Sequence, residues 1–190
     1  MRKITAPKPQ KTARLKFFDT FVKAMGFTYR DLSMSMGYTP PTAACWFRTD
    51  NVKLSQIRKF LEVLPSYPGH EADRYELHIS YKLRKDEKLV DYSEFIRDGK
   101  PVKLMFVWDA IRRSGLSKQG IARRMGSAYE KLKYWKETDD ICTDDMYALA
   151  VALEAQLVFE FVPESNDADS DVPGVEYSIV LRNRQTIVSE

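Results

Sequence analysis

The sequence predicts an α+β fold, mainly α, made of two tandem helical units that are each followed by a short β-hairpin. Apolar residues recur at helical spacing in several short segments. Two other segments, 75–83 and 156–162, alternate apolar and polar residues as strands do. The first half of the chain also resembles the second half at a constant offset, which indicates an internal duplication.

Composition limits the classes of protein to consider. The 190 residues are 44% hydrophobic and 12% aromatic, enough for a core, which excludes a disordered chain. Cys45 and Cys142 have no metal-ligand spacing and suit a reducing compartment, so we expect a cytoplasmic protein. No long apolar segment occurs, which argues against a membrane span or secretion.

The net charge of +3 is divided unevenly along the chain. Residues 1–136 carry 28 Lys and Arg against 14 Asp and Glu, whereas residues 137–190 carry 2 against 13. The basic part is typical of a surface that attracts phosphates. Residues 137–176 are the acidic stretch, and their NDADSD run lacks the glycine and glutamate of an EF-hand loop. We therefore expect no metal.

Residues 1–16 are expected to form a basic, flexible arm, because Pro7 and Pro9 prevent a helix over the first ten residues. Two interpretations of the arm are open. It lies along phosphates or in a minor groove, or it is a solvated tail that raises solubility. On the first interpretation, the contacts come from Arg2, Lys3, Lys8 and Lys11.

Residues 17–100 are predicted to form the first unit, and residues 101–190 the second. An offset of 89 residues, the distance from Gly26 to Gly115, aligns the two without a gap over roughly fifty residues. In the first unit we expect helices from Thr12 to Met25 and from Ser55 to Leu64, then a hairpin of 75–83 with 88–92. In the second we expect a helix at 143–154 and a hairpin of 156–162 with 175–181. Hairpin edges then pair with each other or with a second chain.

The stretch from Gly115 to Thr138 contains two short helices around a turn at Gly126. Two such helices form a helix-turn-helix, whose second helix enters the DNA major groove. The residues GLSKQGIARRMG and LKYW resemble the Cro and phage-repressor helix-turn-helix family. Trp46 and Trp135 occupy equivalent positions, and we expect both to be buried.

The resemblance implies DNA contacts from the start of the first of these helices and from the exposed face of the second. In the second unit these residues are Lys118, Gln119, Tyr129, Glu130, Lys131, Lys133 and Tyr134. Lysines can meet phosphates or guanine, and tyrosine a phosphate or a thymine methyl. Acids from Glu137 to Asp145 follow this helix and are expected to repel a nearby phosphate backbone.

The first unit has fewer side chains that can form hydrogen bonds with bases. Thr39 is expected to cap its second helix, and the candidate DNA contacts are Tyr29, Arg30, Thr39, Thr42 and Arg48. The remaining face is apolar, so it either contacts DNA or packs against the other unit or a second subunit.

The sequence contains no catalytic constellation and no phosphate-cradling glycine loop, so we expect neither an enzyme nor a cofactor. It favours a sequence-specific regulator that binds double-stranded DNA through tandem helix-turn-helix units. The alternative is a protein-interaction module, an adaptor or antitoxin-like protein that does not read DNA. A homodimer is also possible, formed through the hairpin edges or through the helix face of the first unit. A third interpretation has the acidic tail from Glu164 onward covering the basic surface.

Overall fold

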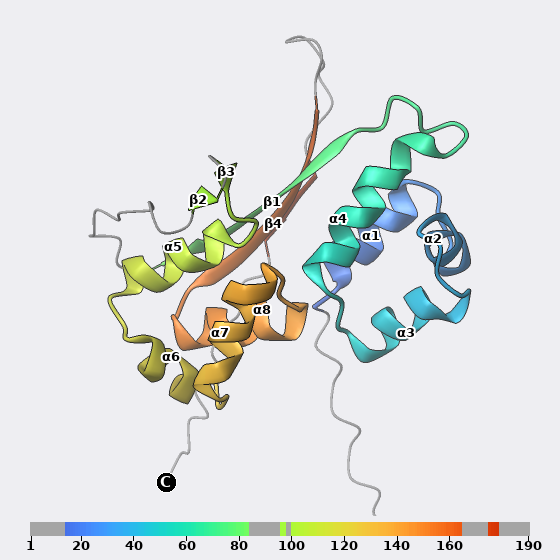
Figure 1. The fold of residues 1–190 in the computed structure, drawn as a ribbon. Coiled ribbons are helices and arrows are strands. Elements are labelled where there is room, and N and C mark those ends of the chain that lie inside the picture. The colour runs from blue at the N-terminus through green and yellow to red at the C-terminus, as the bar shows by residue number, and fades with distance from the viewer. Residues whose placement is uncertain (1–13, 84–95, 98–99, 165–174, 179–190) are drawn as a thin grey trace, which may run out of the picture.

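Eight short α-helices and small antiparallel sheets make up the described part of the chain (Figure 1). The computed structural model describes residues 14–83, 96–97, 100–164 and 175–178. The α+β, mainly helical class predicted from the sequence is confirmed. Within the described residues, no helix has the length and apolarity that crossing a bilayer requires.

The helices of the two halves fall at equivalent positions. The first half contains α1 (Lys16–Ala24), α2 (Tyr29–Ser35), α3 (Pro41–Thr49), α4 (Leu54–Val63) and the 3-10 turn η1 (Leu64–Ser66). The second half contains α5 (Met105–Ser114), α6 (Lys118–Arg124), α7 (Tyr129–Thr138) and α8 (Thr143–Ala152). The offset between the halves is 89 residues, the distance from Gly26 to Gly115. When this offset is added to the first and last residues of α2 and α4, the results are the first and last residues of α6 and α8.

Glycines make the same turn in both halves. Gly37 between α2 and α3 has φ +74°, and Gly126 between α6 and α7 has φ +63°. A side chain is disfavoured at such positive φ values, so each glycine permits a tight turn. The buried tryptophans follow the same equivalence, since Trp46 and Trp135 are 8% and 1% exposed. The prediction that they pack in the core is confirmed.

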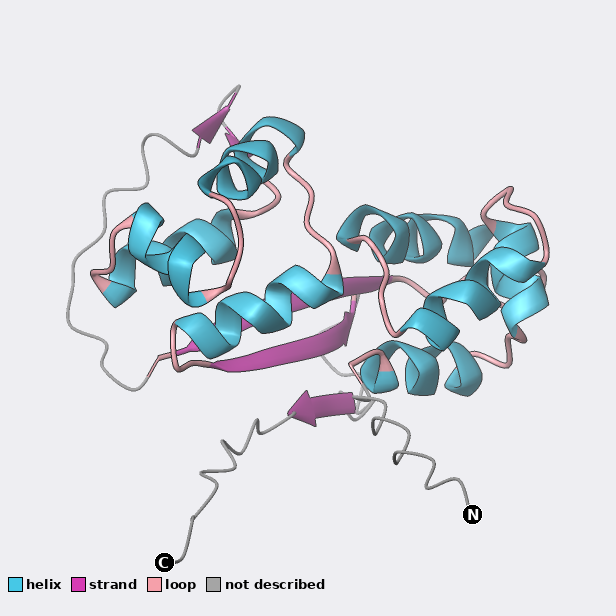
Figure 2. Cartoon of the chain, turned by 90° about the horizontal axis from the view of Figure 1, so that it is seen from below, coloured by secondary structure: helices cyan, strands magenta, loops and turns pink. Residues whose placement is uncertain are grey.

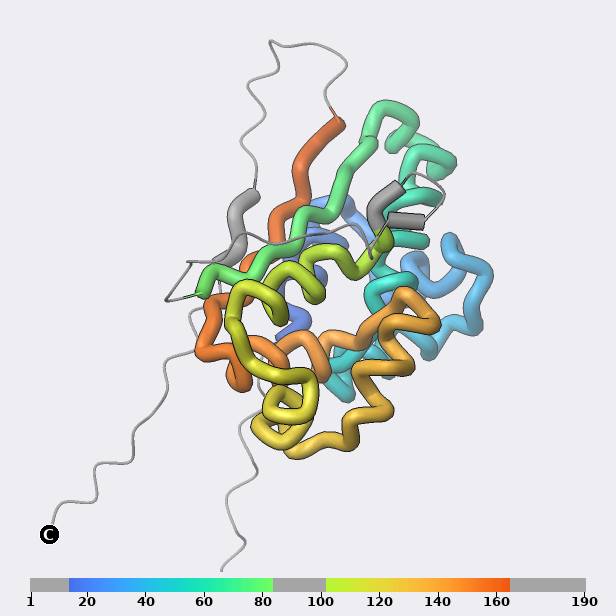
Figure 3. The backbone as a smooth tube through the Cα atoms, turned by 60° about the vertical axis from the view of Figure 1, so that its left-hand side comes forward, coloured from blue at the N-terminus to red at the C-terminus, as the bar shows by residue number. Residues whose placement is uncertain are grey.

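A three-stranded antiparallel sheet joins the halves. Its order is β1 (Tyr75–Lys82), β4 (Gln156–Pro163) and β5 (Val175–Ser178). Tyr75 lies opposite Pro163 and Lys82 opposite Gln156, so β1 and β4 run side by side although they are far apart in sequence (Figure 3). A separate two-stranded sheet pairs β2 (Ile96–Arg97) with β3 (Lys100–Pro101).

Strands from the two predicted hairpins pair with each other in one sheet. The described partner of β1 is β4, so the first unit's strand pairs with the second unit's strand. The sequence left open whether hairpin edges pair with each other or with a second chain, and the structure has the first arrangement. The pairing of β4 with β5 is confirmed over residues 175–178. The predicted partner at 88–92 lies outside the described residues.

Packing explains why the strands meet. Figure 2 shows a helical group at each end with strands running between the groups. Phe17 and Phe21 on α1 stack on Phe159 and Phe161 of β4, with ring centroids 3.9 Å apart in each pair. Tyr81 of β1 donates a hydrogen bond to the Met146 carbonyl of α8 (3.1 Å). Each half therefore completes its core with residues of the other half.

A local pseudo-twofold axis passes between the loops that precede α4 and α8. The N–H of Leu54 donates to the Ile141 carbonyl (2.8 Å), and the N–H of Thr143 donates to the Val52 carbonyl (2.9 Å). The two bonds are equivalent, because each residue of one bond lies 89 positions from a residue of the other. Lys53 also forms a β-bridge with Cys142, which is its equivalent in the second half. The arrangement is that of an isologous dimer interface within one chain.

The same loops cap the helices across the axis. The N–H of Ser55 in α4 donates to Asp140 Oδ1 (3.0 Å), and Ser55 Oγ donates to Asp140 Oδ2 (2.7 Å). Reciprocally, the N–H of Asp144 in α8 donates to Asn51 Oδ1 (3.1 Å). Neither helix has a side-chain cap from its own N-cap residue, Lys53 or Cys142. The start of each helix is thus satisfied by the opposite half.

A second pair of aspartates closes each unit on itself. Asp50 accepts from the N–H groups of Arg14 and Leu15 (both 2.9 Å), and Asp139 accepts from those of Lys103 and Leu104 (2.7 and 3.0 Å). The first helix begins at Lys16 rather than at the predicted Thr12, which lies outside the described residues. The Asp50 carboxylate therefore satisfies backbone N–H groups at the start of α1.

Removing a cross-axis cap should destabilise the whole chain. We expect Asp140→Ala to lower the free energy of unfolding by about 1 kcal/mol, because the first turn of α4 loses its acceptor. Urea denaturation measures it. Glu137→Ala is the matched control, since Glu137 is exposed and lies 3.8 Å from Lys133 in a surface ion pair, and its effect should stay within about 0.5 kcal/mol. Equal losses in both variants would contradict the capping role.

Candidate nucleic-acid interface

The start of α6 holds Lys118 and Gln119 in place. Ser117 accepts a hydrogen bond from the Gly120 N–H (3.1 Å), which caps the helix. Buried Ile121 fixes one face of α6 against the core, leaving Gln119 exposed. Lys118 is half-buried, with Nζ 5.9 Å from the centre of the Trp108 ring.

The outer face of α7 carries most of the predicted second-unit contacts. Leu132 and Trp135 are buried and anchor the helix. Outside this buried face Tyr129 and Tyr134 are 43% and 52% exposed, high values for large aromatic side chains. Exposed side chains beside them, Glu130 and Lys133, complete a mixed polar and aromatic surface.

Lys131 has a structural partner that the sequence did not indicate. Its Nζ lies 2.5 Å from Asp145 Oδ1, and the other oxygen of Asp145 accepts from Trp135 Nε1 (3.4 Å). Asp145 is only 8% exposed, so its charge needs this cation. The carboxylate also contributes to raising the pKa of the Cys142 thiol, after burial, which is the main cause. Lys131 therefore secures α7 to α8 and is a poor probe of DNA contact.

The predicted first-unit contacts are more scattered. Tyr29 is half-buried, stacks on Phe47 and donates to Asp19 Oδ1 (2.6 Å). Burial and that hydrogen bond raise the pKa of its phenol, so it stays neutral. Arg30 and Arg48 are exposed, and Arg48 Nη2 lies 3.5 Å from Cys45 Sγ. Both guanidinium groups face solvent at the two ends of the α2–α3 pair.

Thr39 does not cap α3, contrary to the sequence prediction. The N-cap residue is Pro40, which has no side-chain cap, and the Thr39 and Thr42 hydroxyls lie 3.0 Å apart. Buried Ser33 of α2 caps α3 instead, because its Oγ accepts a hydrogen bond from the Ala43 N–H (2.9 Å). Sequence reasoning missed Ser33, since a serine inside a helix gives no local capping signal.

The acids after α7 have internal partners, which the sequence did not reveal. Asp139 caps the start of α5, and Asp140 caps α4 across the axis. Asp144 forms an ion pair with Arg14, and Asp145 with Lys131. These four charges are therefore partly neutralised within the chain, and the expected repulsion of phosphates is reduced. The only available signal was the identity of Asp50 and Asp139 at the repeat offset.

The arm residues Arg2, Lys3, Lys8 and Lys11 lie outside the described part of the chain. Among the residues that the structure does describe, no three His, Cys, Asp or Glu side chains gather as a metal site would require. A cavity of about 340 Å³ lies between α4 and β1. Two arginines and three glutamates surround it, among them Arg58, whose pKa is lowered by burial. This mixture of charges does not select an anionic or a cationic cofactor.

Comparison with known proteins adds no further information, because no protein-family model, curated protein or solved structure matches this chain. The two helix pairs and the groups that they expose are therefore the features that bear on function.

Two neighbouring lysines on α7 should behave differently when their charge is removed. We expect Lys131→Met to lower the free energy of unfolding by about 1–2 kcal/mol, because buried Asp145 loses its cationic partner. Lys133→Met is the control and should change it by less than about 0.5 kcal/mol. Urea denaturation measures both. The double variant Lys131→Met with Asp145→Asn should recover part of the loss, and a loss unchanged in that variant would contradict the pairing.

Proposed function

We propose that this chain is a sequence-specific double-stranded DNA-binding protein, a transcriptional regulator that uses tandem helix-turn-helix units. In this proposal α2–α3 is one unit and α6–α7 the other, with α3 and α7 as the helices that enter the major groove. The observation that carries it is the exposed face of α7, where Tyr129, Lys133 and Tyr134 lie on a helix anchored from behind by Leu132 and Trp135.

The arrangement of the two units supports the same proposal. Both α3 and α7 lie along the lower edge of the molecule in the view of Figure 1. The pseudo-twofold bridge between Lys53 and Cys142 lies in the loops that follow these helices. A twofold arrangement of reading helices matches the two major-groove faces of a duplex, which recur about 34 Å apart. The partner chain that a phage repressor needs would here be part of the same polypeptide.

The charge distribution supports an anionic ligand, as DNA is. Residues 1–136 carry 28 Lys and Arg against 14 Asp and Glu. The acids closest to α7 are engaged as helix caps or ion pairs. Phosphate binding by lysines releases counterions, so binding should weaken steeply as salt increases.

A second candidate is the protein-interaction module, and the face of α3 favours it. Pro40, Pro41 and Ala44 are exposed there, and Cys45 is half-buried. This face offers few hydrogen-bonding groups to a base edge. A chain that forms a stable complex with a partner protein through α3 and has no affinity for duplex DNA would support this candidate.

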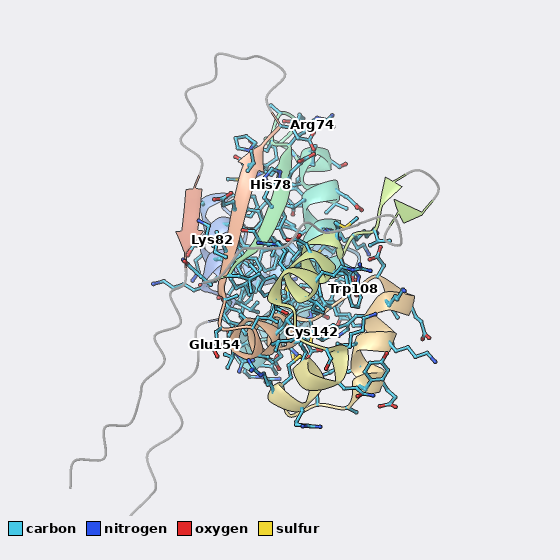
Figure 4. All side chains as sticks on the ribbon, turned by 90° about the vertical axis from the view of Figure 1, so that its left-hand side faces the viewer. Arg74, His78, Lys82, Trp108, Cys142 and Glu154 are labelled. Carbon is cyan, nitrogen blue, oxygen red and sulfur yellow. The ribbon has the colours of Figure 1, made fainter. Side chains whose placement is uncertain are left out.

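The leading proposal is tested with duplex DNA of random sequence at low and moderate salt. Double substitution Lys118→Glu and Lys133→Glu should weaken binding and reduce the slope of log K against log salt by about 2, roughly 1 for each lysine. Fluorescence anisotropy measures both quantities. Lys82→Glu is the control for a single charge, because Lys82 is exposed on β1 (labelled in Figure 4) and belongs to neither helix pair. No duplex binding at low salt would overturn the proposed function.

A further inference from the structure

The two helices that would enter the groove occupy equivalent places but expose different side chains. We propose that the target of this protein is an asymmetric, non-palindromic duplex, with one half-site read by α7 and a different half-site contacted by α3. This inference rests on the proposed DNA-binding function and specifies the class of site. It follows from a comparison of the two units position by position.

Several scaffold positions of the two units hold the same residue type. Identical residues at the 89-residue offset include the turn glycines Gly37 and Gly126, the buried Trp46 and Trp135, and the capping pair Asp50 and Asp139. These residues set the turn, the core and the closure of each unit. The backbone framework that presents α3 is therefore equivalent to the one that presents α7.

The candidate contact positions share no residue. For the second-unit residues that the sequence predicts as DNA contacts, Lys131 apart, the first-unit equivalents are Tyr29 for Lys118, Arg30 for Gln119, Pro40 for Tyr129, Pro41 for Glu130, Ala44 for Lys133 and Cys45 for Tyr134. A homodimer presents two copies of one surface and so requires two copies of one half-site. This chain presents two different surfaces.

The chemistry of each surface points to a different half-site. On α7, exposed Glu130, Lys133 and Tyr134 offer hydrogen-bonding groups, which distinguish base pairs by their donor and acceptor patterns. On α3, exposed Pro41 and Ala44 offer carbon atoms, which contact thymine methyl groups. Arg30 and Arg48 at the two ends of the α2–α3 pair have the charge for phosphates, which position a protein without reading sequence. The α7 half-site should be strongly specified, and the α3 half-site weakly specified and rich in thymine.

The two surfaces cannot be exchanged or separated without breaking the fold. Reciprocal backbone bonds join Leu54 to Ile141 and Thr143 to Val52 at the axis. Eight residue pairs join β1 to β4, from Tyr75 opposite Pro163 to Lys82 opposite Gln156. Each chain therefore carries one α3 surface and one α7 surface in a fixed order. One chain on one duplex completes the complex, with the polarity of the site set by the protein.

Selection from a random duplex library by the full chain tests the inference. We expect a motif without dyad symmetry, in which a specified half-site and a thymine-rich half-site lie about one helical turn apart. Two palindromes built from either half-site alone should bind at least about tenfold more weakly, because mismatched base pairs in a site carry costs of that size. Light scattering of the complex should give one chain per duplex.

Variants on each surface then assign the half-sites. Lys133→Ala should relax base preference only in the specified half-site. Ala44→Lys, which gives the first unit the residue type of Lys133, should create a new preference only in the weak half-site. Both positions are exposed, so a thermal unfolding curve close to that of the unchanged chain confirms that the fold is intact.

The outcomes separate the two proposals. A palindromic motif, two chains per duplex, or a specified half-site with no second half-site would overturn the asymmetric target while leaving DNA binding in place. Failure to retain any duplex at low salt would overturn the DNA-binding function itself, and the inference with it.

Discussion

The structure depends on the reciprocal contact between the loops that precede α4 and α8. There each half supplies a backbone carbonyl and a helix cap to the other, through Asn51 and Asp140. An isolated half would leave the first turn of its fourth helix without an acceptor, and a strand without its neighbour. The contact therefore does more than join two units, because it satisfies polar groups that neither unit satisfies alone.

The aromatic packing reinforces this exchange. Rings of α1 stack on β4, and the hydroxyl of Tyr81 in β1 reaches the backbone of α8. Because these contacts cross from one half to the other, the relative orientation of α3 and α7 is set by a continuous core. A fixed orientation is what a protein needs if two helices are to meet two faces of the same duplex.

The sequence predicted the helices well and the tertiary pairing poorly. Periodicity located helices that the structure places within a few residues of their predicted bounds, and the repeat identified Gly37, Trp46 and Asp50 as shared positions. The contacts of the aspartates could not be predicted in the same way. Asp50 and Asp140 accept hydrogen bonds from N–H groups that are distant in sequence, and no spacing rule identifies such a partner. The same applies to Asp145, whose pairing with Lys131 crosses from α7 to α8. The hairpin prediction was incomplete because alternation marks a strand without naming its neighbour.

The pairing of β1 with β4 has a consequence for biosynthesis. When residues 1–100 have left the ribosome, β1 has no β4 beside it and α4 has no Asp140. The partner strand ends only at Pro163, so β1 cannot complete its pairing with β4 until about sixty further residues have been made. Contacts of such long sequence separation slow folding. The duplication that supplies an internal partner thus delays completion of the native state until nearly the whole chain has been synthesised.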